Sequence, residues 1–265
     1  MSRIKETLDR LHTERRKALV IFLTAGDPSL AATVGLALAA AKAGADIIEL
    51  GVPFSDPLAD GPVIQRSFQR AIHAGANVTG IMKMAAQIRE ESQVPLAFMV
   101  ATTLVINHGV KRFMADAAQA GIDGIILPDA PLEEAEEFLP AARGAGLDAI
   151  FLAAPTTTPP RLKAIAALST GFLYYINVSG VTGGKSASVG DVSAAIKRAK
   201  KLSKIPVMAG FGIKTPQQAR DLAKVADGVI IGSAAVDIAA GAKGKSAEEA
   251  LARFIRSVRK EMDRA

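Results

Sequence analysis

The sequence contains no cysteine and no tryptophan among its 265 residues, and it has only two tyrosines and three histidines. Without cysteine, a disulfide framework, a thiolate metal site and a cysteine nucleophile are all excluded. The histidines, His12, His73 and His108, lack the close spacing of a histidine-based zinc motif. We therefore expect no metal site, and we expect the chemistry to depend on carboxylates and backbone amides.

The sequence also lacks an uninterrupted apolar stretch long enough to cross a membrane. Its longest uncharged segments, Ser92–Val110 and Ala164–Gly184, are broken by proline, glycine or asparagine. The first 17 residues have no apolar core of a secretory signal, and they carry acidic residues that transit peptides avoid. We expect a cytoplasmic protein without a membrane partner, and the missing cysteines agree with this.

Positive charge is in modest excess, with 32 Lys and Arg against 26 Asp and Glu and a net charge of +6. Such an excess can indicate a nucleic-acid partner. Here the basic residues are dispersed, and the densest runs, within 197–204 and 253–264, lie on helix-like segments where they resemble solvated faces. Few aromatic side chains are available to stack on bases. We therefore expect no nucleic-acid partner.

Eight apolar runs rich in β-branched residues recur along the chain and predict eight strands. They span residues 18–26, 46–52, 95–103, 123–129, 147–155, 171–178, 205–212 and 227–234. The runs are almost continuously apolar, as expected for strands that are covered on both faces. Segments with apolar residues at three- and four-residue spacing lie between them and predict helices. This alternation indicates parallel strands joined by crossover helices.

The junctions between predicted helices and strands form a weak internal repeat. Its four copies are Gly44-Ala-Asp46, Gly121-Ile-Asp123, Gly146-Leu-Asp148 and Ala226-Asp227. A glycine can end a helix in the left-handed conformation, and a short polar residue can start the turn into the next strand. Repeated units without a Pro-, Gly- or Ser-rich linker favour a single (β/α)₈ TIM barrel over an open sheet, with residues 1–265 as one domain. Residues 3–16 then form an extra N-terminal helix over the bottom of the barrel.

Two connections are longer than the others, those after the second and the sixth strand. The extra length lies in residues 51–77 and 179–191. In TIM barrels the loops that follow the strands form the active-site face. We therefore expect the functional site to include these extended loops.

Two carboxylates accompany the first long loop. Glu49 lies near the end of an apolar strand, where partial desolvation would raise its pKa and suit it to proton transfer, although a structural carboxylate is the alternative. Asp60 lies in a loop bounded by Pro57 and Gly61. Its spacing alone favours a turn residue or a cap of the helix beginning at Pro62.

Glycine-rich segments end the seventh and eighth strands, at Gly210-Phe211-Gly212 and Gly232-Ser233. Glycine lets a backbone approach a phosphate closely, and amides at a helix N-terminus point at the anion. The loops after strands seven and eight commonly form a phosphate site in TIM barrels. Gly183, after the sixth strand, either adds an amide to this site or serves as a hinge.

The stretch from Glu49 to Gln65, ELGVPFSDPLADGPVIQ, closely resembles the signature of the tryptophan synthase alpha chain family. Further resemblance covers nearly the whole chain, at residues 22–28, 127–129, 174–175, 179–183, 210–212 and 232–233. The resemblance implies a (β/α)₈ barrel that cleaves indole-3-glycerol phosphate into indole and glyceraldehyde 3-phosphate.

Carried onto this sequence, the resemblance makes Glu49 the acid and base of a retro-aldol cleavage and Asp60 the acceptor of the indole N–H. It also implies a set of substrate-binding residues: Phe22, Tyr174, Thr182, Gly183, Gly210, Phe211, Gly212, Gly232 and Ser233.

The resemblance further implies a partner. The family's alpha chain binds a beta chain that carries pyridoxal phosphate, in an alpha2-beta2 heterotetramer, and it holds no cofactor of its own. This sequence departs from the family after the third strand. The usual pattern there is M-x-Y-x-N, whereas this chain has Met99, Ala101 and Thr103, without the aromatic ring and the amide. That connection contributes to the family's contact with the beta chain.

Three alternatives stay open at the level of sequence. Another phosphate-handling barrel, such as an isomerase or an indole-glycerol-phosphate synthase, would lack the loop at residues 53–62, and the synthase would need a strand lysine that is missing here. A non-catalytic phosphate-binding partner subunit would have little reason to keep both Glu49 and Asp60. A stand-alone indole-3-glycerol-phosphate lyase would retain every site residue.

Overall fold

The computed structural model of the protein describes residues 2–57, 60–176, 189–210, 212–242 and 244–265. Within these residues, nine parallel strands form one sheet in the order β5-β4-β3-β2-β1-β9-β8-β7-β6. The strands are β1 Ala18–Thr24, β2 Ile47–Gly51, β3 Leu96–Met99, β4 Gly124–Ile126, β5 Asp148–Ile150, β6 Leu152–Ala153, β7 Leu173–Ile176, β8 Val207–Gly210 and β9 Gly228–Ile231. Since only Phe151 separates β5 from β6, the two edge strands are halves of one predicted strand, and the sheet forms a nearly closed barrel.

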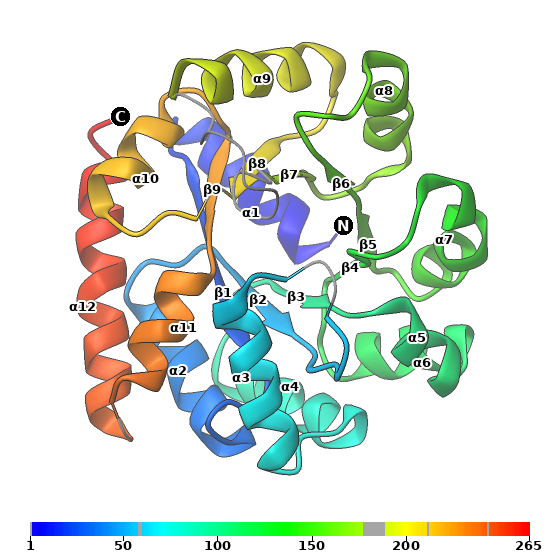
Figure 1. The fold of residues 1–265 in the computed structure, drawn as a ribbon, viewed down its shortest axis with the longest axis vertical. Coiled ribbons are helices and arrows are strands. Elements are labelled where there is room, and N and C mark those ends of the chain that lie inside the picture. The colour runs from blue at the N-terminus through cyan, green and yellow to red at the C-terminus, as the bar shows by residue number, and fades with distance from the viewer. Residues whose placement is uncertain (1, 58–59, 177–188, 211, 243) are drawn as a thin grey trace.

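Helices surround this barrel (Figure 1). They are α1 Arg3–Thr13, α2 Leu30–Lys42, α3 Pro62–His73, α4 Val78–Glu91, α5 Thr102–His108, α6 Val110–Gln119, α7 Ala135–Gly144, α8 Pro159–Leu168, α9 Val189–Leu202, α10 Pro216–Ala223, α11 Ser233–Ala240 and α12 Lys245–Met262, with a 3-10 turn at Leu132–Glu134. The predicted (β/α)₈ barrel is confirmed. In the part of the chain that is described, no helix is long and apolar enough to cross a membrane.

Side chains alternate along each strand between the barrel interior and the helix layer. In β1, Val20 and Phe22 pack inside the barrel, whereas Ile21 and Leu23 pack against the helices. Phe22 is in register with Glu49 of β2, and Glu49 is in register with Ala97 of β3. The two-residue period of a strand therefore places the Glu49 side chain inside the barrel.

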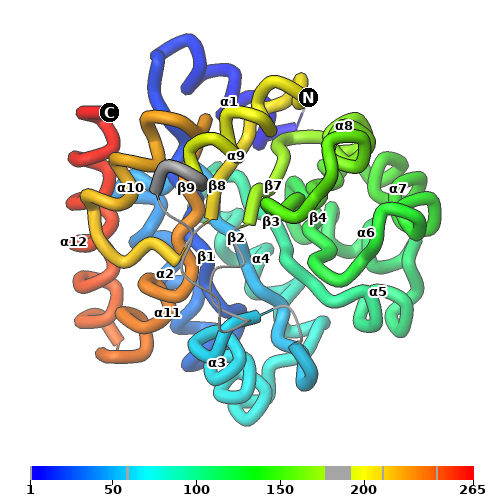
Figure 2. The backbone as a smooth tube through the Cα atoms, turned by 45° about the horizontal axis from the view of Figure 1, so that its top comes forward, coloured from blue at the N-terminus to red at the C-terminus, as the bar shows by residue number. Residues whose placement is uncertain are grey.

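The extra N-terminal helix covers one end of the barrel, as predicted. Ile4, Leu8 and Leu11 of α1 are buried among the interior side chains of the strands. Ser2 caps α1 by accepting a hydrogen bond from the Lys5 amide, and its hydroxyl also donates to Asp148 at the start of β5. Figure 2 shows α1 at one end of the molecule and α3 near the other.

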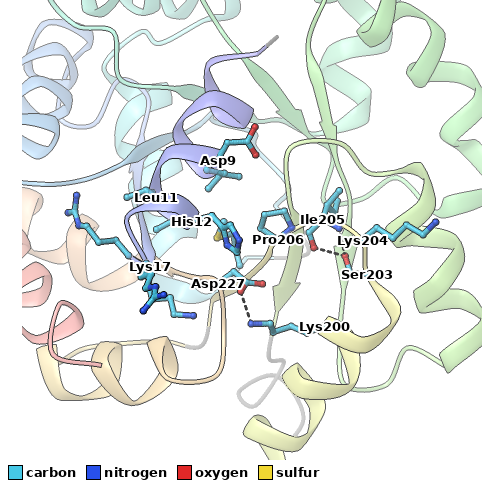
Figure 3. Close-up of a pocket in the computed structure, with 15 residues that line it drawn as sticks. Asp9, Leu11, His12, Lys17, Lys200, Ser203, Lys204, Ile205, Pro206 and Asp227 are labelled. Carbon is cyan, nitrogen blue, oxygen red and sulfur yellow. Dashed lines mark hydrogen bonds and ion pairs between the residues drawn. The ribbon is translucent and has the colours of Figure 1, made fainter.

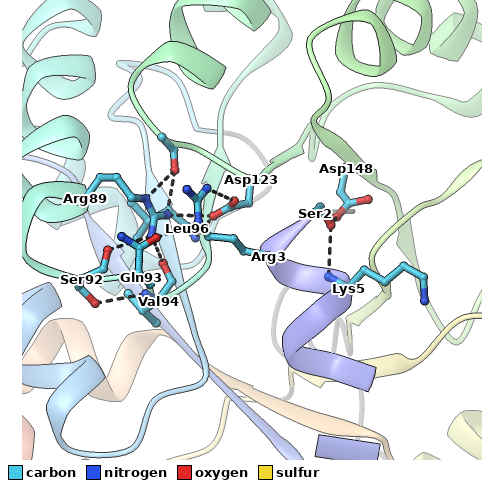
Figure 4. Close-up of polar contacts among 11 residues, drawn as sticks. Ser2, Arg3, Lys5, Arg89, Ser92, Gln93, Val94, Leu96, Asp123 and Asp148 are labelled. Atoms are coloured by element: carbon cyan, nitrogen blue, oxygen red, sulfur yellow. Dashed lines mark hydrogen bonds and ion pairs between the residues drawn. The ribbon is translucent and has the colours of Figure 1, made fainter. Parts of the chain in front are cut away.

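Three aspartates of the internal repeat each accept a backbone amide of the preceding strand at this end of the barrel. Asp46 accepts the Leu19 amide at 2.9 Å, Asp123 accepts the Leu96 amide at 2.9 Å, and Asp227 accepts the Val207 amide at 3.0 Å. Buried or partly buried cations complete three of these sites: Arg259 at Asp46, Arg89 and Arg3 at Asp123, and Lys200 at Asp227. Figure 4 shows the Asp123 cluster. The sequence repeat therefore marks a repeated bond between neighbouring strands.

The glycines of the repeat adopt the predicted left-handed conformation, with φ of +109° at Gly44, +86° at Gly121 and +75° at Gly146. After Gly44, the Ala45 amide donates back to Ala40 across the helix end, which is the Schellman pattern. The same pattern follows Gly121 and Gly146. Each helix thus turns sharply into the next strand.

Two long connections were predicted, and the structure describes the first of them except for residues 58–59. After β2 the chain forms a loop and then two helices, α3 and α4, which accounts for the long spacing. Hydrogen bonds join helix α3 to the carboxyl end of β1. The Thr24 and Ser67 hydroxyls lie 2.6 Å apart, and Arg70 donates two hydrogen bonds to Asp27. Most of the second connection, residues 177–188, lies outside the described residues.

The third strand is shorter than predicted. The apolar run at residues 95–103 predicts one strand, but β3 ends at Met99 and α5 begins at Thr102. The carboxylate of Asp129 explains the start of α5, since it accepts hydrogen bonds from the Thr102 amide and hydroxyl at 3.0 to 3.1 Å. His108 is the last residue of α5 and lies 2.7 Å from Asp116.

Replacing Asp123 by alanine should lower the free energy of unfolding by about 3 kcal/mol, because it leaves the Leu96 amide without its acceptor and removes the carboxylate that pairs with the largely buried Arg89. Urea unfolding followed by circular dichroism measures this change. Asp9→Ala is the matched control: it removes an exposed pair with Lys5 and should cost below about 0.5 kcal/mol. Equal effects of the two substitutions would contradict the structural role of Asp123.

Candidate active site

A cavity of about 200 Å³ opens where the carboxyl ends of the strands meet. Eight of the residues that the sequence predicts for the site line it: Phe22, Glu49, Asp60, Tyr174, Gly210, Gly212, Gly232 and Ser233. The other three, Thr182, Gly183 and Phe211, lie outside the described residues. Strands β1, β2, β7 and β8, the loop after β2 and the start of α11 contribute these residues, so segments far apart in the sequence form one cavity.

The cavity also contains apolar residues that the sequence reasoning missed. These are Ile64, Met99, Pro128, Leu152, Ile176 and Ile230. For Met99 and Ile230 a signal existed, because each occupies an inward position of its strand and packs with the barrel interior. Only the register between strands shows which inward position reaches the cavity.

Glu49 is fully buried, with none of its surface exposed. Neither of its carboxyl oxygens has a hydrogen-bond partner among the described residues. Burial raises the pKa of Glu49 from an ordinary 4.5 to about 8, and the negative charge of Asp60 adds to this effect. A carboxyl group in this setting holds its proton at neutral pH and can donate it.

Asp60 lies between β2 and α3, and its backbone is held in place by neighbouring residues. Its amide donates to the Pro57 carbonyl at 3.3 Å, and its carbonyl accepts from the Gln65 side chain at 2.8 Å. Helix α3 begins at Pro62 with Gly61 as its N-cap and without a side-chain cap. The capping role that spacing alone favoured is therefore wrong, and the Asp60 carboxyl is available to the cavity. Burial raises its pKa from 3.8 to about 6.

The two carboxyl groups consequently differ in protonation state over a range of pH. Between about 6 and about 8, the pKa values leave Glu49 protonated and Asp60 ionised. Paired groups whose surroundings separate their pKa values divide the roles of proton donor and charged acceptor between them. The cavity therefore combines a general acid with a carboxylate at neutral pH.

Tyr174 forms part of the cavity wall on β7, and burial together with the charges of Glu49 and Asp60 raises its pKa well above 10. Its hydroxyl therefore stays protonated. A Cβ at Gly210 would lie 3.4 Å from the tyrosine ring and hydroxyl, which is an ordinary van der Waals contact. On the other wall, a Cβ at Gly51 would lie 2.3 Å from the Phe22 ring. Gly51 therefore lets the Phe22 ring lie close to the barrel backbone.

The side of the cavity formed by Gly212, Gly232 and Ser233 is suited to an anion. Gly212 adopts a left-handed conformation with φ of +60°, and Gly232 is the N-cap of α11 without a side-chain cap. The first amides of a helix lack partners within the helix, and its dipole favours negative charge at this end. The Ser233 hydroxyl lies at the same place. This wall can therefore hold a phosphate group.

Within the part of the chain that the structure describes, no cluster of three or more His, Cys, Asp or Glu side chains could hold a metal ion. His12 lies on α1, His73 ends α3 and His108 ends α5, so none of the three lines the cavity.

Replacing Glu49 by glutamine should stabilise the protein increasingly as pH rises. The folded pKa of Glu49, about 8, exceeds its ordinary 4.5, so the stability contributed by its proton is complete below about pH 4.5 and is lost as pH rises through 8. Glutamine titrates nowhere in this range. Urea unfolding at pH 5, 7 and 9 should show a widening difference in favour of the variant, whereas a variant of the exposed Glu134, Glu134→Gln, should show none. A constant difference would contradict the raised pKa.

Comparisons with known proteins agree with this geometry. The family model of the tryptophan synthase alpha chain matches residues 8–265. The tryptophan synthase alpha chain of Geotalea uraniireducens is 45% identical over 98% of this chain and 97% of its own, and that of Geobacter sulfurreducens is 48% identical over 90% of each.

Solved structures show the same relationship. The alpha subunit of tryptophan synthase from Legionella pneumophila superposes with a TM-score of 0.94 at 36% identity and full coverage of both chains. A ligand-free tryptophan synthase structure from M. tuberculosis gives 0.89 at 33% identity, covering 99% of each chain. The chain therefore belongs to the tryptophan synthase alpha chain family and, with that family, to the carbon–carbon lyases of tryptophan biosynthesis.

Proposed function

We propose that the cavity between Glu49, Asp60 and Tyr174 is the site where this chain cleaves indole-3-glycerol phosphate to indole and glyceraldehyde 3-phosphate. The alpha reaction of the family is this retro-aldol cleavage. The assignment of the site rests on the state of Glu49. Its carboxyl group is fully buried, has a pKa of about 8 and has no hydrogen-bond partner among the described residues. Such a group is a poor structural element, because burying it unpaired costs stability.

Glu49 acts first as an acid and then as a base. Its proton is transferred to C3 of the indole ring, which makes the ring an electron sink. The bond between C3 and the side chain then breaks, and its electron pair returns to the ring. The carboxylate of Glu49 takes the proton of the adjacent side-chain hydroxyl as the new carbonyl forms, so the acid is restored at the end of the cycle.

Asp60 supports the same step through its charge. Protonation at C3 places positive charge on the ring nitrogen, and a carboxylate that accepts the indole N–H stabilises this charge. The lower pKa of Asp60, about 6, keeps it ionised while Glu49 is still protonated. The raised pKa of Tyr174 makes its hydroxyl a neutral donor on the same cavity wall.

The remaining walls account for the other parts of the substrate. The Phe22 ring and the apolar side chains of Ile64, Leu152 and Ile230 suit the flat indole ring. Gly212, Gly232 and Ser233 suit the phosphate, through amides at the start of α11 and a hydroxyl. We assign Gly210 to the substrate wall, and Thr182, Gly183 and Phe211 to the same binding role on the resemblance of their sequence.

We further propose that this chain works with a beta chain in an alpha2-beta2 heterotetramer in the cytoplasm. The pyridoxal phosphate of that assembly belongs to the beta chain, while every step assigned above uses carboxyl groups, a hydroxyl and amides of this chain. A partner surface is available beside β3, where Ile106 of α5 is 50% exposed next to Ala101 and Thr103.

Glu49→Gln is expected to lower the rate of indole release at pH 7 by about 10³-fold or more, because glutamine cannot transfer a proton. In the unsubstituted enzyme, kcat/KM should follow a bell-shaped profile with limbs near pH 6 and 8. Indole release by the isolated chain, measured from pH 5 to 9, tests both expectations. Binding of inorganic phosphate, measured by isothermal titration calorimetry, should persist in the variant and shows that the site is intact. Near-normal turnover in the folded variant would exclude the role of Glu49. If the unsubstituted chain releases no indole, a non-catalytic subunit is favoured.

Mixing the chain with the tryptophan synthase beta chain of a related organism, such as Geobacter sulfurreducens, should yield a complex with the mass of two chains of each kind in size-exclusion chromatography with light scattering. Ala101→Tyr combined with Thr103→Asn restores the family's usual residues and should tighten the association by roughly tenfold, since a tyrosine is a frequent energetic anchor in interfaces. The exposed Lys163→Gln serves as the neutral control. Strong indole release with no association in either form would favour a stand-alone lyase.

A further inference from the structure

A second cavity lies at the opposite end of the barrel from the catalytic cavity and has a volume of about 670 Å³. Helix α1, the segment that leads into β1 and the segment that leads into β8 surround it (Figure 3). Its residues take no part in the proposed reaction. Cavities of several hundred Å³ are typical of sites for small organic molecules.

The inner surface of this cavity is apolar. Ile205 and Pro206, which precede β8, line it and keep part of their surface exposed. Leu8, Leu11, Ala18 and Met208 also line it but are almost fully buried. Hydrophobic side chains that line a concave surface favour a ligand with an apolar body, because contact with it removes their remaining surface from water.

The rim, in contrast, is strongly basic. Lys17, Arg15 and Lys204 line the cavity and form no ion pair among the described residues. Lys200 also lines it and pairs with Asp227 at 2.6 Å, and Figure 3 shows this pair on the same side as Lys17. Acidic groups are few on this rim: Asp227 is engaged by Lys200, and Asp9 pairs with Lys5.

Lys17 is partly buried, and its surroundings disfavour its own charge. Burial lowers the pKa of Lys17, and the charge of Lys200 lowers it further, while Asp227 acts in the opposite direction. An anion placed among these cations would reverse this unfavourable balance. The isolated cavity therefore has an excess of positive charge that a bound anion would neutralise.

The backbone at Arg15 adds an independent observation. After α1 the chain makes the same Schellman turn as after Gly44, with the Arg16 amide donating to the Leu11 carbonyl, but its left-handed residue is Arg15, with φ of +55°. A glycine is favoured at this position because it has no Cβ. An arginine that replaces it bears local strain and holds a guanidinium at the rim, and strained residues often occur at binding sites.

We propose that this cavity is a second ligand site, which binds an organic anion consisting of an apolar, ring-sized body and one carboxylate or phosphate group. The apolar body rests on Ile205 and Pro206, and the anionic group lies among Lys17, Arg15 and Lys204. Strand β8 extends from this cavity at Met208 to the catalytic cavity at Gly210, so the two sites share one element.

A matched pair of probes tests the site: 2-naphthoate, which carries the carboxylate, and 2-naphthamide, which has the same rings without charge. Isothermal titration calorimetry measures their affinity for the full chain, and amide chemical shifts in NMR spectra locate them. We expect 2-naphthoate to bind more tightly than the amide and to shift the amides of Leu8, Leu11 and Lys17. Lys17→Gln should weaken its binding by about tenfold and Lys204→Gln by about threefold.

Controls separate this site from the catalytic one. Lys163→Gln removes an exposed lysine of α8 and should change neither the affinity nor the shifts, and all three variants should release indole at the unsubstituted rate. Thermal unfolding verifies that each variant is folded. If Lys17→Gln does not fold, Lys204→Gln, at an exposed position, still tests the proposal. Equal affinity for the two probes, shifts confined to Gly210, Gly212 and Gly232, or unchanged affinity in the folded lysine variants would overturn the proposal.

Discussion

Every strand of this barrel buries both of its faces, and the rest of the structure depends on that constraint. One face packs against the other strands and the second against the helices, as the alternation of Val20 and Phe22 with Ile21 and Leu23 shows. A polar side chain on either face must therefore be paired or bear the cost of desolvation. Glu49 bears that cost, and its raised pKa is the chemical result.

The aspartates beneath α1 and the two carboxyl groups of the catalytic cavity have opposite surroundings. At the end covered by α1, Asp46, Asp123 and Asp227 accept strand amides and cations, which fixes the strands relative to one another. At the other end, Glu49 lacks such partners among the described residues, and Asp60 is partly buried. Pairing makes the first group a source of stability, whereas its lack leaves the second group free to exchange protons.

Much of this arrangement can be predicted from the sequence. The eight apolar runs gave the strands, and the long spacing after the second strand located the loop that contains Asp60. For Asp60, local pattern favoured a turn residue or a cap, and only the cap is wrong, because spacing does not show that Gly61 already serves as the N-cap. It also extended the third strand past Met99, since the cause of its end is the carboxylate of Asp129, 27 residues from Thr102. Contacts between distant segments decide such features, and no local pattern contains them.

The attachment of α3 to β1 has a mechanical consequence. After Asp60 in the sequence, two contacts fix α3 to the barrel: Thr24 with Ser67 and Asp27 with Arg70. Before Asp60, the chain is fixed by β2, whose register with β1 includes Glu49. Asp60 therefore lies between two elements that are both fixed to the barrel. Its position relative to Glu49 depends on hydrogen bonds that are made outside the catalytic cavity.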